Sequence, residues 1–158
     1  MAPVTLRSAT ISTFEELALL MAEGADGADR PADAPLAGGV RVGFAGPLRG
    51  AVTVRVTACV LDAVAANMLG RRLPAGDPLC RDALGELANV LCGTLLPVLA
   101  GPRAEFRLSP PEWLDAGEPT TPARGALAAS LAVPLETGRA EVLLHLDDAP
   151  FAAGAGRA

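Results

Sequence analysis

The polar residues of one stretch, residues 78–97, have types and spacing suited to a shared site. Asp82, Glu86, Asn89 and Gly93 are three or four residues apart, so at about 100° per residue they fall within a narrow arc of an α-helix. This arc offers a carboxylate, a second carboxylate one turn later, an amide after that, and a glycine without an obstructing side chain. A partner molecule can reach such a row. A metal-dependent hydrolase built on Asp82 and Glu86 is the least favoured interpretation, because no histidine joins them and Asn89 is a poor ligand.

The remaining residues of this stretch predict the helix that presents the row. Asp77 is placed to accept a hydrogen bond as N-cap, and Pro78 occupies the first helical position, where its missing N–H costs nothing. Pro97 cannot donate to the carbonyl of Gly93, so the helix is predicted to end or kink there. A hydrophobic cluster on the opposite face is predicted to join the core; it consists of Leu84, Leu87, Leu91, Leu95 and Val98.

The composition excludes several kinds of chemistry. A chain of 158 residues, 51% hydrophobic and 20% charged, is typical of one globular domain. All 13 basic residues are arginine, so no lysine is present for a Walker A motif or a Schiff base. The single histidine, His145, has no serine or cysteine placed beside it to form a triad. A net charge of -5 with dispersed arginines argues against a nucleic-acid surface.

The cysteines and the hydropathy pattern predict a soluble cytoplasmic protein. Cys59, Cys80 and Cys92 are odd in number, lack CxxC spacing and lie largely in apolar segments, so free buried thiols are favoured over a disulfide or a zinc site. No run approaches 18 uncharged apolar residues, and the N-terminus lacks a basic region followed by an apolar one.

Alternating patterns predict two β-hairpins. Apolar residues occupy every second position over residues 40–44 and 52–58, on either side of a GPLRG turn. The same pattern occurs over residues 127–135 and 142–146, on either side of an ETGR turn. The glycines of the first hairpin do not suggest a phosphate loop, because no GK[ST] sequence or crossover helix follows them.

The other segments complete an α+β domain. We expect a short helix over residues 14–22 behind a capping box that begins at Thr13, and a second helix over residues 61–69. Residues 104–108 read as a short strand. The resulting domain, residues 1–146, has a mainly antiparallel sheet with its helices packed on one face. Three segments are predicted to be irregular: a flexible connection at residues 23–39, a proline-rich loop at 109–123 and a disordered tail at 147–158. Trp113, in the proline-rich loop, is either a core anchor, which we favour, or a contact residue.

The central helix resembles the motif helix of the CheC, CheX and FliY family of chemotaxis phosphatases. The family signature is Asp or Ser, three residues, Glu, two residues, Asn, which Asp82-x-x-x-Glu86-x-x-Asn89 matches in full. The flanks are similar too, with a hairpin and a helix ending AANMLG before the motif and strands after it. The resemblance covers residues 40–146. Because the helix at residues 61–69 has Ala66 and Leu69 where a second motif needs Glu and Asn, single-motif CheX-like members are the closer likeness.

This resemblance implies a function and a partner. The substrate would be the aspartyl phosphate of a CheY-like response regulator, whose own receiver domain holds Mg²⁺, and the phosphatase would have no cofactor or metal of its own. Asn89 would position the attacking water, and Glu86 would contact the regulator by pairing with a lysine at its phosphorylation site. Asp82 would be a peripheral partner contact. CheX-like members often form homodimers, so a homodimer is implied as well.

Two other interpretations remain open at this point. The polar row is either a solvated helix face without a function, or the recognition surface of a non-catalytic CheX-like module that binds or sequesters a receiver or another signalling protein.

Overall fold

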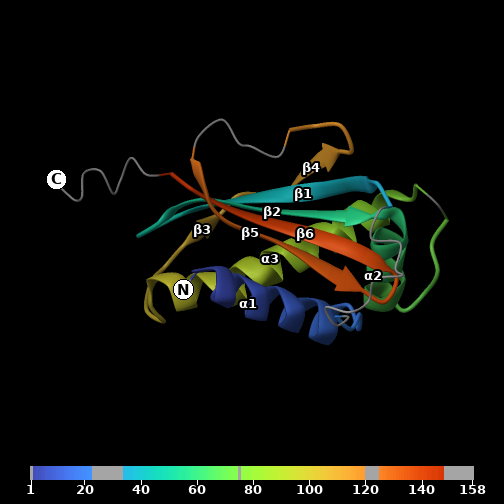
Figure 1. The fold of residues 1–158 in the computed structure, drawn as a ribbon, viewed down its shortest axis with the longest axis horizontal. Helices are drawn as coiled ribbons and strands as arrows, with labels where there is room; N and C mark the ends of the chain where they lie inside the picture. The colour runs from blue at the N-terminus through green and yellow to red at the C-terminus, as the bar shows by residue number, and fades with distance from the viewer. Residues whose placement is uncertain (1, 23–33, 75, 120–124, 148–158) are drawn as a thin grey trace.

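The computed structural model describes residues 2–22, 34–74, 76–119 and 125–147. The elements in chain order are α1 (Ala2–Leu17), β1 (Leu36–Ala45), β2 (Arg49–Thr57), α2 (Ala58–Leu69), α3 (Pro78–Ala100), β3 (Arg107–Leu108), β4 (Glu112–Asp115), β5 (Ala126–Leu135) and β6 (Gly138–Leu146). All of these strands are antiparallel and join one sheet in the order β3-β1-β2-β6-β5, with β4 paired to β1. Helices α1 and α3 run side by side across one face of this sheet, and α2 lies at one end of them (Figure 1). The predicted α+β class, with an antiparallel sheet and helices on one face, is confirmed.

Both predicted hairpins form, and together they make up most of the sheet. Strands β1 and β2 pair with each other, as do β5 and β6, and β2 pairs with β6 to join the two hairpins. Val40 and Val142 both lie opposite Val54, so the three side chains share one face of the sheet. All three are buried. The alternation seen in the sequence therefore marks the face that the helices cover.

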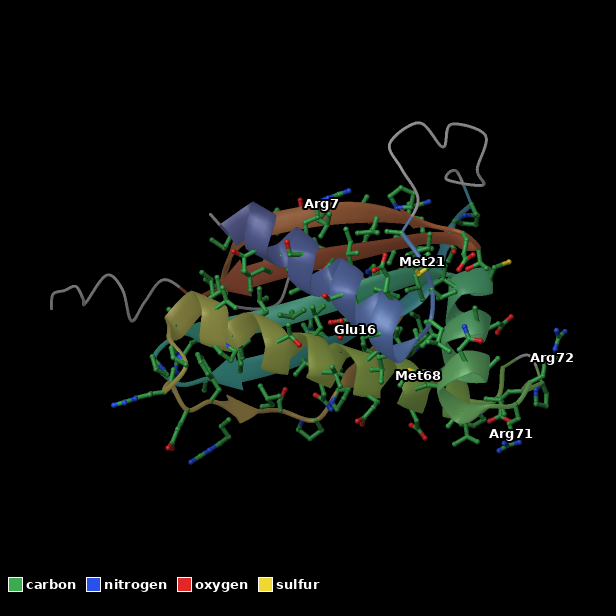
Figure 2. The ribbon with its side chains drawn as sticks, turned by 90° about the horizontal axis from the view of Figure 1, so that it is seen from below. Arg7, Glu16, Met21, Met68, Arg71 and Arg72 are labelled. Atoms are coloured by element: carbon green, nitrogen blue, oxygen red, sulfur yellow. The ribbon has the colours of Figure 1, made fainter. Side chains whose placement is uncertain are left out.

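Beneath the sheet, α1 and α3 close the core. Figure 2 shows both helices crossing the same face, with α2 standing at their end. Full burial of each large side chain contributes roughly 1.5–3 kcal/mol. The largest fully buried side chains include Leu6, Phe14, Leu84, Leu87, Leu91, Leu95, Leu135 and Leu144.

The first helix differs from its prediction in both boundaries. It spans Ala2–Leu17, and Thr13 lies inside it, where its hydroxyl donates to the carbonyl of Ala9 at 2.7 Å. The predicted capping box is therefore wrong, because Thr13 bonds back along the helix instead of capping a new one. The chain leaves the helix through Leu19, whose φ of 58° is left-handed. Asn67 of α2 donates to the carbonyl of Ala18, the residue directly after α1, at 2.8 Å, and so ties the end of α1 to α2.

The central helix is longer than predicted. It begins at Pro78, as expected, and continues through Pro97 to Ala100. One missing backbone hydrogen bond is tolerated here, since Gly101 N–H donates to the Pro97 carbonyl at 2.8 Å and closes the last turn. Among the described residues, α3 alone is long and apolar enough to span a membrane, with a mean hydropathy of 1.6, but half of that window is buried in the core.

Two segments that were predicted to be irregular contain strand residues. Strand β1 begins at Leu36, inside the expected connection at residues 23–39, whose residues 23–33 lie outside the described residues. The proline-rich loop contains β4, which pairs with residues 38–41 of β1. The strand expected at residues 104–108 is reduced to β3, Arg107–Leu108. Of the predicted tail at 147–158, the structure describes only Asp147.

Candidate active site

Helix α3 starts as its sequence predicts, and this start sets the position of the polar row. The Asp77 carboxylate accepts a hydrogen bond from Leu79 N–H at 2.9 Å, and Pro78 follows it at the first helical position. The cap fixes where the helix begins, so it also fixes which residues face the sheet.

The buried side of α3 confirms the predicted phase of the helix. Leu84, Leu87, Leu91 and Leu95 are fully buried against the sheet and its neighbouring helices. Val98 was assigned to the same cluster, but its side chain is 65% exposed, so this assignment is wrong. It lies beyond Pro97 on a part of the helix that emerges from the core.

The predicted site residues lie together at one groove. The side chains of Asp82 and Glu86 are exposed, and Asn89 is half-buried. The groove has a volume of about 390 Å³ and lies between α3 and the chain that leads into β4. Its lining residues are Val40, Arg81, Asp82, Gly85, Glu86, Asn89, Pro111 and Trp113.

Asn89 differs from its two neighbours in its surroundings. Its Oδ1 atom is buried and has no hydrogen-bond partner among the described residues. An amide oxygen left without a partner is costly, by about 1–3 kcal/mol, so such a group favours any arrangement that supplies a donor. A half-turn of the terminal amide exchanges its oxygen and nitrogen, because the two ends have nearly the same shape. After this rotation the oxygen, which is the acceptor atom, lies where the structure has the amide nitrogen.

One wall of the groove was not predicted to be part of the site. Pro111 packs on Gly85, where an added Cβ would lie 3.1 Å from two carbons of the proline ring. Trp113 lies at the same wall and packs against the core, as the favoured interpretation of it as a core anchor expects. The four residues of β4 show no alternation that would have signalled this wall, and the place of β4 beside α3 depends on pairing with β1, which is distant in sequence.

The histidine and the cysteines lie outside this groove. His145 pairs across the sheet with Ala51, on the face away from Val54 and the helices. Its burial, and the nearby Arg41, lower the pKa of its imidazole. All three cysteines are free: Cys80 and Cys92 are buried, as expected, whereas Cys59 is exposed. Burial raises the pKa of the Cys92 thiol to about 12, which leaves it inert as a nucleophile.

A comparison of this sequence with models of protein families agrees with the resemblance seen in the motif. The sequence model of the family described as chemotaxis phosphatase CheX matches residues 39–136, which include all of α3 and the groove. The chain belongs to the chemotaxis phosphatase CheX family. No curated protein sequence matches the chain significantly. Membership of the CheX family makes this chain a phosphatase by class, in agreement with the activity that the motif implied.

Solved structures of the CheX family share the fold. The chemotaxis protein CheX of a Desulfovibrio desulfuricans subspecies is 17% identical, with a TM-score of 0.73 over 92% of this chain and 99% of that one. The CheX protein of Vibrio vulnificus is also 17% identical, with a TM-score of 0.69 over 91% of this chain and 95% of that one. A CheX-CheY-BeF3-Mg²⁺ complex from Borrelia burgdorferi is 16% identical, with a TM-score of 0.64 over 93% of this chain and 98% of that one. At these identities the structures establish the common fold.

Proposed function

We propose that this protein hydrolyses the aspartyl phosphate of a CheY-like receiver domain, with Asn89 and Glu86 as its catalytic residues. The observation that supports this proposal is their juxtaposition in one groove, with Glu86 exposed and Asn89 half-buried one helical turn away. The matching family is one of chemotaxis phosphatases. The related Borrelia burgdorferi structure is a complex of CheX with CheY.

The chemistry needs an oriented water more than a protein nucleophile. Water attacks phosphorus, the bond from phosphorus to the aspartyl oxygen breaks, and inorganic phosphate leaves a free aspartate behind. The receiver contributes the Mg²⁺ that neutralises the phosphoryl oxygens. The Asn89 amide accepts from and donates to the water, and so holds it in line with the bond that breaks.

Glu86 and Asp82 serve the docking of the receiver. Among the described residues, neither carboxylate forms a hydrogen bond or an ion pair within the chain, so both are free to bind a partner. Glu86 pairs with a lysine at the receiver's phosphorylation site, one turn from the amide that holds the water. Asp82, one turn further back, contacts the edge of the docked receiver.

A second candidate is a non-catalytic module that binds the phosphorylated receiver and sequesters it. The buried Oδ1 atom of Asn89 favours this alternative, because an acceptor atom that solvent does not reach holds no water in that rotamer. Both candidates use the same docking face. They differ in whether the bound receiver loses its phosphate faster than the free receiver does.

We also propose that the protein acts as a cytoplasmic homodimer. Strand β5 pairs with β6 on one side, and five of its ten residues are exposed. Such an edge is suited to pairing with a second copy. Light scattering at high protein concentration tests this: a dimer gives twice the 16.0 kDa of one chain, and a constant mass of 16.0 kDa contradicts the proposal.

Phosphate release from a panel of phosphorylated receivers of the same cell tests the catalytic proposal. At least one receiver should lose phosphate faster with this protein than alone, and chelation of Mg²⁺ should abolish the effect. If a receiver binds but loses its phosphate no faster than it does alone, the protein is a sequestering module and not a phosphatase.

A further inference from the structure

One basic side chain stands at the rim of the acidic groove. The guanidinium carbon of Arg81 lies 4.6 Å from the centre of the Trp113 ring. Within the described part of the chain, Arg81 forms no ion pair and no hydrogen bond. Stacking on an aromatic ring restrains the guanidinium without using its N–H donors. An exposed arginine held in this way keeps its donors for a ligand from outside the chain.

The aromatic ring that holds Arg81 is itself fixed. The Trp113 indole N–H donates to Asp115 Oδ1 at 2.9 Å. Gly38 makes room for the ring, because a Cβ at that position would overlap it. The ring also packs against the hydrophobic core. These contacts keep Trp113 in one orientation, so Arg81 is positioned before any partner arrives.

The acids of β4 do not compete for Arg81. Glu112 pairs with Arg41 at 3.1 Å, and Asp115 is occupied by the indole of Trp113. Asp82 and Glu86 also line the groove, but neither is within ion-pair distance of Arg81. The groove therefore presents one unpaired cation beside two unpaired carboxylates.

We propose that Arg81, supported by Trp113, binds a surface carboxylate of the receiver and so selects the receiver that docks. The inference rests on the proposed function for the class of the partner. Arg81 and Asn89 are eight residues apart, so their positions are separated by about 12 Å along the helix axis. The side chain of Arg81 also leans toward the start of the helix, away from the docked phosphoryl group. Arg81 therefore meets a different part of the receiver from the part that Asn89 meets.

The arrangement of charges explains how selection works. Glu86 attracts a lysine, while Arg81 attracts a carboxylate that lies at a set distance from that lysine. A receiver with the opposite charge at either point places like charges together, which weakens docking. Because both contacts exist before and during the reaction, they raise affinity without changing the rate of the chemical step.

Binding of the beryllofluoride-loaded receivers of the same panel tests the inference without any hydrolysis, on the receiver that the parent protein binds most tightly. Arg81→Glu should raise the Kd by at least about tenfold, whereas Arg103→Glu, an equal charge change at an exposed arginine beyond the end of α3, should change it less than about twofold. With the phosphorylated receiver, Arg81→Glu should raise KM and leave kcat unchanged. Thermal melting of both variants checks that each is folded.

A mutant cycle tests the part played by Trp113. Trp113→Phe keeps a ring but loses the hydrogen bond to Asp115, so as a single substitution it should weaken binding of the receiver. In a protein that already carries Arg81→Glu, adding Trp113→Phe should weaken binding no further. Substituting the receiver's acidic residues by arginine one at a time should yield one variant that restores binding to Arg81→Glu. Restored binding assigns the carboxylate.

Three results overturn the inference. One is an Arg81→Glu protein that binds as tightly as the parent. Another is a loss of binding confined to the loaded receiver and absent for the unloaded one, since this would place Arg81 on the phosphoryl group. The third is a parent protein that binds no loaded receiver, which removes the proposed function too. By contrast, a parent that binds but does not hydrolyse refutes only the catalytic proposal.

Discussion

Gly85 and Pro111 touch at one wall of the groove, where a Cβ added to Gly85 would lie 3.1 Å from both Cβ and Cγ of the proline. Glycine at this position lets the chain before β4 approach α3, and so gives the groove its second wall. At Gly93, two turns further along the same helix, an added Cβ would meet no heavy atom of the described chain within 4 Å apart from the adjoining residues and backbone of its own helix. The two glycines of α3 are therefore a matched pair for substitution, because an added methyl group meets a neighbouring segment at Gly85 and none at Gly93.

Alanine at these two glycines should affect stability differently. Gly93→Ala should stabilise the protein by about 0.5–1 kcal/mol, because alanine favours the helix and nothing obstructs its methyl group. Gly85→Ala should gain less than half as much, since Pro111 must move by a few tenths of an ångström. Urea unfolding of both variants measures the difference. Equal stabilisation would mean that the wall at Pro111 yields without cost.

Truncation of α3 should distinguish its two faces. Leu87→Ala should lower the free energy of unfolding by roughly 2–5 kcal/mol, because Leu87 is fully buried. Val98→Ala should change it by less than about 0.5 kcal/mol, since Val98 is 65% exposed. Chemical denaturation of the two variants checks the prediction. Similar losses at both positions would contradict the assigned faces.

Stability should fall below neutral pH in part because of His145. Burial, followed by Arg41, lowers the pKa of the folded imidazole below its ordinary value of 6.5. As the pH falls below 6.5, the unfolded chain therefore takes up a proton that the folded chain resists, and the folded state loses stability until the folded pKa is passed. Above 6.5 this contribution is fully present.

A variant without the imidazole provides the comparison. Unfolding of the parent and of His145→Phe between about pH 7.5 and about pH 5 should show a steeper loss for the parent. Parallel pH profiles would indicate that His145 titrates alike in both states.

The two carboxylates of the groove should differ in importance. Glu86→Ala should lower both turnover at limiting receiver (kcat/KM) and the binding of a receiver loaded with a phosphoryl mimic, because an ion pair with the receiver is lost before and during the reaction. Asp82→Ala should have the smallest effect among the three residues of the motif. Kinetics and binding are measured on the same preparations. An Asp82 variant that loses more activity than the Glu86 variant would reverse their roles.

Sequence alone predicts α3 well because its signals are local. The cap at Asp77, the proline after it and the leucine spacing all lie within the helix or next to it. The site row follows from the same phase, and the polar side chains of Asp82 and Glu86 are exposed as expected. Most of helix α1 was not predicted, because part of its buried face consists of Thr10 and Thr13. Threonine counts as polar in a hydropathy pattern, so these positions interrupt the apolar periodicity of the helix.

The second wall of the groove was not predictable from local patterns. Strand β4 has only four residues, and it exists because it pairs with β1, about 70 residues earlier in the chain. The orientation of Trp113 depends on the space left by Gly38 and on Arg81 from another element. Such contacts arise only when distant segments meet, so the sequence could place Trp113 in a loop but not at the site.

The turnover of Asn89→Ala with its cognate receiver tests the central claim most directly. An amide that only orients the attacking water should be worth roughly 10²-fold or more in the rate of phosphate release. The variant should still bind the receiver loaded with a phosphoryl mimic about as tightly as the parent does. Single-turnover phosphate release, with Mg²⁺ in excess, measures the chemical step itself. A rate at least one hundredfold below that of the parent is the predicted result, and a rate equal to the parent's would contradict the proposal that Asn89 is catalytic.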